Sequence, residues 1–101
     1  MVDLKYRIAG DISTSWVSVT TTNLSAGGMR FRNVTPLEPA TQLILQFSLP
    51  GIAKPINVNG MVVWKEMQAS GVSESGVEFT GLKDEERRQI DQFVAFLSKG
   101  A

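Results

Sequence analysis

The sequence predicts a mainly β protein: a six-stranded antiparallel β-barrel with a C-terminal α-helix. Three observations indicate this fold. Over the first three quarters of the 101 residues, apolar and polar side chains alternate with the period of a half-buried strand. Turn residues divide that stretch into about six short segments. After Gly81 the apolar residues recur at helical spacing. Together they indicate one domain, residues 1–101, with the barrel over about 2–80 and the helix over about 83–98.

The first three strands are expected before residue 33. Apolar residues take every second position from Val2 to Ile8, and turn residues follow at Gly10-Asp11 and Ser13–Ser15. β-branched residues favour a second strand over about Trp16–Thr22. In Met29–Arg32 the apolar side chains are expected to face inward and both arginines outward.

The clearest alternation in the chain is Leu43–Leu49, which ends at Pro50-Gly51. The preceding stretch Thr35–Pro39 is expected to be a loop, because two prolines so close together do not fit a central ladder.

The fifth expected strand is Ile56–Trp64, with Trp64 on the same face as the other apolar residues of the strand. Gly60 in its middle predicts a bulge or a bend. Gln68–Ser75 is then expected to be a polar connection, followed by a last short strand over Val77–Phe79.

The helix is expected to begin near an acidic first turn, Asp84–Glu86, which suits the positive end of a helix dipole. Its apolar stripe is Ile90, Phe93, Val94 and Leu97. This stripe is expected to pack on the barrel, although a partner could also bind it. Phe96 lies off the stripe and is a candidate for a contact surface.

Composition excludes several classes of function. Ten Lys and Arg balance ten Asp and Glu, which argues against a protein that binds DNA or RNA. The sequence has no His and no Cys, so thiolate catalysis, a cysteine zinc site and the usual neutral-pH general base are absent. We expect no enzyme, catalytic residue, metal site or cofactor. No apolar run approaches the roughly 20 residues of a membrane span, and no signal peptide is evident, so a cytoplasmic domain is expected.

The segment Asn23-Leu24-Ser25-Ala26-Gly27-Gly28 is the least generic part of the sequence. Asn and Ser offer hydrogen-bonding groups, and Gly allows close approach to the backbone. Two outward arginines, Arg30 and Arg32, follow and could bind phosphate or stack on a base. The same residue types also build ordinary tight turns, and outward arginines are often only solvated, so spacing alone favours the turn.

The segment Asn23-x-Ser25-x-x-Gly28 resembles the (Asp/Asn)-x-Ser-x-x-Gly motif of PilZ domains. Further similarity covers nearly the whole chain. It lies in Met29-Arg30-Phe31, Leu37-Glu38-Pro39, Asn59-Gly60-Met61-Val62-Val63-Trp64, Gly76-Val77-Glu78-Phe79 and the closing helix Leu82–Leu97. The resemblance implies a bacterial second-messenger signalling domain whose ligand is cyclic-di-GMP. It also implies that Asn23 and Ser25 hydrogen-bond the nucleotide, while Gly28 keeps the approach clear.

PilZ domains also use an Arg-x-x-x-Arg arm just before the first strand, and no such spacing occurs in these 101 residues. Each charge-assisted hydrogen bond is worth about 1.5–3 kcal/mol, so a site without the two arginines is expected to bind more weakly by several orders of magnitude. Arg7, Arg30 and Arg32 are the residues available to compensate in part.

Three hypotheses follow. The chain is a regulatory domain that binds cyclic-di-GMP, or a degenerate PilZ adaptor that binds a protein of a signalling, motility or secretion system and not nucleotide. The third is an oligonucleotide-binding barrel, against which the zero net charge counts. Trp16 and Trp64 could stack on bases, but packing in the core or at the barrel rim is the simpler expectation for both.

Overall fold

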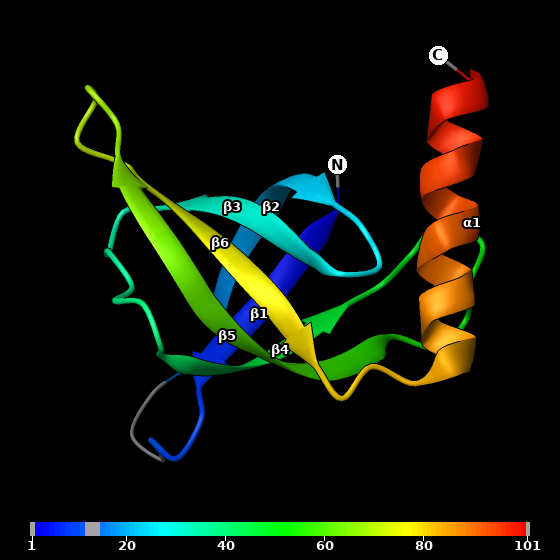
Figure 1. The fold of residues 1–101 in the computed structure, drawn as a ribbon, viewed down its shortest axis with the longest axis horizontal. Helices are drawn as coiled ribbons and strands as arrows, with labels where there is room; N and C mark the ends of the chain where they lie inside the picture. The colour runs from blue at the N-terminus through cyan, green and yellow to red at the C-terminus, as the bar shows by residue number, and fades with distance from the viewer. Residues whose placement is uncertain (1, 12–14, 101) are drawn as a thin grey trace.

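The computed structural model describes residues 2–11 and 15–100, and for residues 98–100 the backbone only. The turn expected at Ser13–Ser15 therefore lies largely outside the described residues. Six strands and one helix follow one another along the chain (Figure 1). They are β1 (Asp3–Ile8), β2 (Val17–Leu24), β3 (Gly28–Asn33), β4 (Gln42–Phe47), β5 (Ile56–Met67), β6 (Ser73–Thr80) and α1 (Asp84–Gly100).

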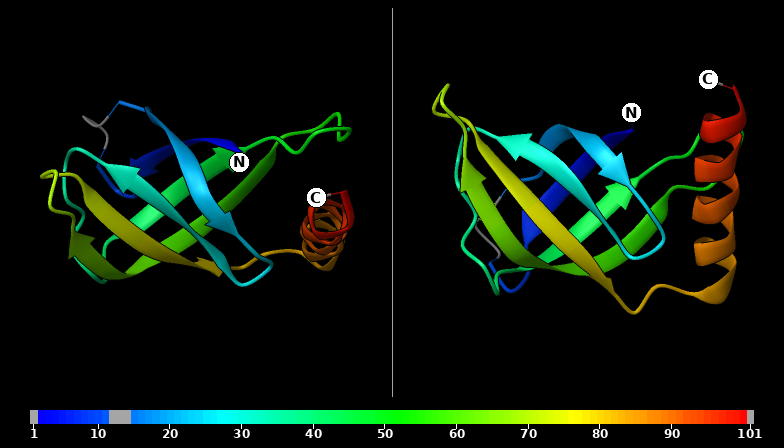
Figure 2. Two further views of the ribbon diagram at one scale, coloured as in Figure 1. Left: turned by 90° about the horizontal axis from the view of Figure 1, so that it is seen from above. Right: turned by 45° about the horizontal axis from the view of Figure 1, so that its top comes forward.

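The strands form a closed barrel in the order β1-β2-β3-β6-β5-β4, and every neighbouring pair is antiparallel. The pairs β3–β6 and β1–β4 join strands distant in the sequence, and the β1–β4 pair closes the barrel (Figure 2). The predicted six-stranded antiparallel barrel with a C-terminal helix is confirmed.

Alternate side chains of each strand fill the barrel interior, as the sequence period predicts. Phe31, Leu43 and Leu45 are completely buried there. Two aromatic pairs stack inside, Tyr6 with Phe31 at 5.2 Å between ring centroids and Phe47 with Phe79 at 6.0 Å. These contacts join β1 to β3 and β4 to β6, so the interior is one continuous core.

The last strand is longer than the sequence indicates. The segment expected as a polar connection, Gln68–Ser75, is split between a short hairpin turn and the first half of β6. Ser73 and Ser75 are completely buried on the inner face of that half. Their small polar side chains hid the alternation, because periodicity arguments depend on apolar residues at the inward positions.

The bulge expected at Gly60 is absent there; β5 is irregular between Val62 and Trp64 instead. Gly60 pairs regularly with β4 and β6. A Cβ at this position would lie 2.7 Å from Val77 Cγ1 and 2.8 Å from Leu45 Cδ1. Glycine at this position thus leaves room for two inward side chains, and the irregularity of β5 lies three residues later.

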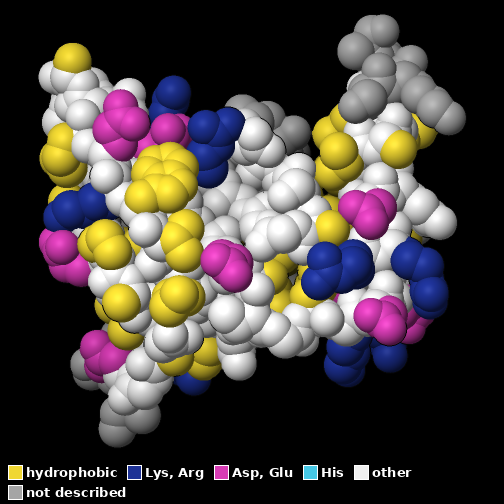
Figure 3. Space-filling model, in the orientation of Figure 1, with side chains coloured by type: hydrophobic (Ala, Val, Ile, Leu, Met, Phe, Trp, Pro, Cys, Tyr) yellow, Lys and Arg dark blue, Asp and Glu magenta, His cyan; other side chains and the backbone are white. Residues whose placement is uncertain are grey.

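Helix α1 lies across one end of the barrel (Figure 2). Ile90 is completely buried, and Phe93 and Val94 pack against the barrel core. Leu97, also assigned to the stripe, is 46% exposed, and Phe96 is 71% exposed. Figure 3 shows hydrophobic side chains in the hollow between α1 and the barrel. The stripe thus packs tightly at Ile90 and loosens toward the helix end. Among the described residues, no helix combines the length and apolar character that crossing a membrane requires.

Candidate functional site

Four residues form a row across the outer face of the barrel. Asn23 of β2 pairs with Arg30 of β3, Arg30 with Gly76 of β6, and Gly76 with Trp64 of β5. The four strands are neighbours in the barrel, so side chains from residues 23 to 76 meet on one surface.

Asn23 faces outward because β2 is irregular between Thr21 and Asn23. Thr21 is buried, so strict alternation would also have placed Asn23 in the core and Leu24 outside. The extra residue at Thr22 reverses this phase. Leu24 packs against the core instead, and Asn23 is exposed at the end of a strand rather than in a loop.

Trp64 reaches the same surface through the irregularity in β5. It was expected to share the inner face with Val62, which is wrong: its partner Gly76 is an outward position between buried Ser75 and Val77. The indole lies directly on that glycine, because a Cβ at residue 76 would be only 2.2 Å from Trp64 Nε1. The absence of a side chain at Gly76 thus allows the indole ring to pack against the backbone of β6.

A shallow hollow of about 240 Å³ lies along this row. Hydrophobic side chains gather on this face over β5 and β6 (Figure 3). The hollow is lined by Asn23, Ser25, Gly27, Gly28, Met29, Arg30, Val63, Trp64, Gly76, Val77 and Glu78. It therefore brings together Asn23, Ser25, Gly28 and Arg30 of the predicted site, and adds Trp64.

The chain from Ser25 to Gly28 forms the hairpin turn between β2 and β3. The Ser25 amide donates to the Gly28 carbonyl at 2.9 Å, and the Gly28 amide donates back at 3.3 Å. The Ser25 hydroxyl accepts from the Gly27 amide at 3.3 Å and lies 3.4 Å from the Gly28 carbonyl oxygen. The motif serine thus builds its own turn, as the simpler interpretation expects, while remaining exposed at the hollow.

Gly28 has a structural reason to be glycine. A Cβ there would lie 2.1 Å from the Val77 carbonyl oxygen of β6, far inside van der Waals contact. Its missing side chain makes room for the neighbouring strand, whereas the sequence interpretation assigned that room to a ligand.

The two predicted arginines differ in their surroundings. Both are exposed on the outer face of β3. The Arg32 Nε lies 3.8 Å from Glu74 Oε2, and Arg32 lies outside the hollow. Arg30 lines the hollow, and within residues 2–11 and 15–100 neither its guanidinium nor the Asn23 carboxamide makes a hydrogen bond or ion pair. The hollow thus offers an amide, a cation and an aromatic ring.

The alternation in the sequence did not indicate that Trp64 lies on the outer face. No motif indicated that Gly76 lies beneath the indole or that Glu74 faces Arg32. One signal was available for the tryptophan: Val62-Val63-Trp64 is an unbroken apolar run, which departs from the alternation before it. The other tryptophan, Trp16, is also outside the core; it is 44% exposed, and the Arg7 guanidinium lies 5.5 Å from its ring centroid.

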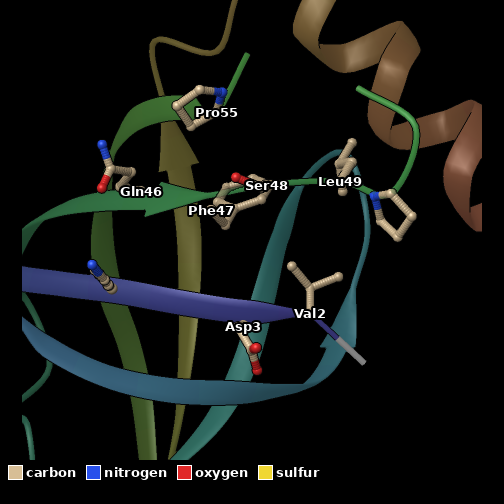
Figure 4. A pocket seen from close by; sticks show the side chains of 9 residues that line it. Val2, Asp3, Gln46, Phe47, Ser48, Leu49 and Pro55 are labelled. Carbon is tan, nitrogen blue, oxygen red and sulfur yellow. The ribbon is translucent and has the colours of Figure 1, made fainter. Parts of the chain in front are cut away.

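A hollow of about 610 Å³, larger than the one along the row, lies elsewhere (Figure 4). It opens where β1 and β4 diverge beyond the Leu4–Phe47 pair, and Val2, Ser48, Leu49 and Pro55 line it. It contains none of the predicted site residues. Within the described ranges, no group of three or more Asp, Glu, His or Cys side chains could hold a metal ion.

The model of the PilZ domain matches residues 2–96. The chain belongs to the PilZ domain family. A comparison with curated proteins finds no match.

Solved structures share the fold of this PilZ domain at low sequence identity. One is the Bacillus subtilis inhibitor of motility MotI/DgrA, with a TM-score of 0.83, 14% identity, and coverage of 98% of this chain and 47% of that chain. Another is Escherichia coli YcgR in complex with cyclic-di-GMP, with a TM-score of 0.77, 12% identity, and coverage of 98% and 42%. The PilZ domain of YcgR with cyclic-di-GMP has a TM-score of 0.67, 13% identity, and coverage of 98% and 82%. The chain thus spans less than half the length of the first two.

Proposed function

We propose that this PilZ domain is a cytoplasmic regulatory domain that catalyses no reaction. It binds cyclic-di-GMP on the outer-face row formed by Asn23, Arg30, Gly76 and Trp64. The observation that carries the proposal is the set of side-chain groups at the hollow that have no hydrogen-bond or ion-pair partner among the described residues. The Asn23 carboxamide can both donate and accept, as recognition of a guanine edge requires. The Arg30 guanidinium can bind phosphate, and an indole face can stack on a base.

The comparisons support the same ligand. Two of the structures with this fold are complexes with cyclic-di-GMP. Without an Arg-x-x-x-Arg arm, we expect this chain to bind more weakly than domains that carry one. Arg30 is the cation best placed to contribute, since it lines the hollow, whereas Arg32 lies outside the hollow and beside Glu74.

Isothermal titration of the chain with cyclic-di-GMP tests the proposal. We expect micromolar or tighter binding, weakened about 10- to 100-fold in Asn23→Ala/Ser25→Ala, because the variant loses two hydrogen-bonding side chains. Asn59→Ala is the matched control: Asn59 is exposed on the outer face of β5 and lies outside the hollow. Equal binding by the double variant would contradict the assigned site.

Fluorescence gives a second measurement. Trp16→Phe leaves Trp64 as the single tryptophan of the chain. Stacking of a base on the indole should change its emission in proportion to the bound fraction, since each base–aromatic stack contributes about 1–3 kcal/mol. Binding by calorimetry without any change in Trp64 emission would remove Trp64 from the site.

The alternative function is a PilZ adaptor that binds a protein of a signalling, motility or secretion system. The exposed Phe96 on α1 favours it. If addition of cyclic-di-GMP produces no heat and no change in melting temperature, nucleotide binding by this chain is eliminated and the adaptor function remains.

A further inference from the structure

The orientation of Asn23 depends on the irregularity of β2 at Thr22. We propose that Thr22 is a positioning residue whose hydroxyl, by donating a hydrogen bond from β2 to β3 or to β6, fixes the local backbone geometry from which Asn23 projects. The ligand-binding consequence rests on the proposed function, whereas the structural consequence does not.

The side chain of Thr22 spans three strands. Its hydroxyl oxygen lies 3.3 Å from the Arg30 carbonyl oxygen on β3 and 3.3 Å from Glu74 Oε2 on β6. The single hydroxyl proton can donate to either acceptor. One contact fixes Thr22 against the residue that pairs with Asn23, and the other ties it to the strand beyond.

The acceptor on β6 is itself fixed. The Glu74 side chain is only 14% exposed, and its Oε2 also faces Arg32 Nε at 3.8 Å. An anchored, mostly buried carboxylate is a stronger acceptor than a mobile surface one. The Thr22 hydroxyl is therefore within hydrogen-bonding distance of a mostly buried carboxylate on β6.

Thr22 acts without touching the ligand. It does not line the hollow, although the next residue does. Hydrogen-bonding groups of a binding site must be held to within about 0.5 Å of their productive positions. Burial of Leu24 selects the phase of the strand, and the Thr22 hydroxyl fixes the local geometry from which the Asn23 side chain projects.

The variant that tests this is Thr22→Val, which keeps the shape and β propensity of the side chain and removes the hydroxyl. Thr20→Val is a closely matched control. Thr20 lies on the same face of β2, and its hydroxyl also bonds a carboxylate, Asp3 Oδ1, at 3.3 Å. Thr22→Ser restores the hydroxyl, and Thr22→Ala replaces the valine variant should that variant fail to fold.

In titrations with cyclic-di-GMP, we expect Thr22→Val to bind about five- to tenfold more weakly than the unmodified chain, the effect of about one hydrogen bond. Thr22→Ser and Thr20→Val should bind within about twofold of it. Unchanged affinity in Thr22→Val, or equal losses in Thr22→Val and Thr20→Val, would overturn the proposal.

Nuclear magnetic resonance of the ligand-free variants separates this inference from the proposed function. The cross-strand contacts between Asn23 and Arg30 should weaken or shift in Thr22→Val and persist in Thr20→Val. If the unmodified chain binds no cyclic-di-GMP, the proposed function fails while this measurement still decides the role of Thr22. Identical Asn23–Arg30 contacts in all variants would reject it.

Discussion

Tyr6 places a phenol hydroxyl inside the largely apolar interior of the barrel. The side chain is 3% exposed and stacks on Phe31, and its hydroxyl accepts a hydrogen bond from Asn33 Nδ2. The same amide nitrogen donates to the Thr35 carbonyl oxygen at 2.7 Å. Asn33 therefore satisfies the buried hydroxyl and at the same time fastens the chain that leaves β3. A buried polar group without such a partner would cost about 1–3 kcal/mol.

Burial raises the pKa of Tyr6 above 10.0, and the Asn33 hydrogen bond opposes this in part. The folded state therefore holds the proton more tightly than the unfolded state. The resulting stability is complete below pH 10 and is lost as the pH rises further. Tyr6 is the only tyrosine, so ultraviolet titration of the phenol measures it directly. We expect a midpoint above 10 in the folded chain and near 10 in denaturant.

The control is Tyr6→Phe, in which the alkaline loss due to this residue should disappear, while Asn33 Nδ2 loses one of its two acceptors and keeps the Thr35 carbonyl oxygen. A folded-state midpoint at or below that of the denatured chain would contradict the assigned effect of burial.

At the scale of elements, the turn before β4 carries backbone strain. The Thr41 amide donates to the Glu38 carbonyl at 3.2 Å, with Pro39 and Ala40 between them, and Ala40 has a φ of 75°. This is the pattern of a type II turn, whose third residue is normally glycine. The Ala40 amide also donates to the Val62 carbonyl at 2.7 Å, so the turn is fastened to β5.

Ala40→Gly should therefore stabilise the domain. Removing the methyl group relieves a left-handed strain of about 1–2 kcal/mol, and the greater freedom of glycine in the unfolded chain offsets about 0.4–1 kcal/mol. Thermal denaturation should show a melting temperature higher by several degrees. Ala53→Gly, in an exposed loop without positive φ, should be neutral or destabilising. A lower melting temperature for Ala40→Gly would exclude this strain.

The sequence predicted the positions of the strands and the helix well. It predicted less well which face of a strand each residue occupies. Alternation identified five strands nearly at their observed positions, because apolar residues mark the inner face. It misplaced Trp64 because a bulge reverses the alternation without changing composition. The (Asp/Asn)-x-Ser-x-x-Gly spacing made Asn23 a candidate site residue, and only the pairing of β2, β3, β6 and β5 shows which residues lie beside it.

At the scale of the whole molecule, one buried residue anchors the helix. Ile90 is completely buried, whereas Phe96 is largely exposed. Ile90→Ala should destabilise the domain by about 2–5 kcal/mol, while Phe96→Ala should change stability by no more than about 0.5 kcal/mol. Chemical denaturation measures both. Equal effects of the two substitutions would mean that the helix does not depend on Ile90.

Closure of the barrel limits how a protein partner could recognise this domain. Each strand has a neighbour on both sides. In the described residues the unpaired edges are short stretches, such as residues 17–20 of β2 on the β3 side and residues 64–67 of β5 on the β4 side. An incoming peptide could therefore add a strand only over a few residues. Recognition would then depend mainly on side chains, either on the outer face or on α1. Selectivity among partners would follow from the shape and charge of those side chains rather than from main-chain hydrogen bonds.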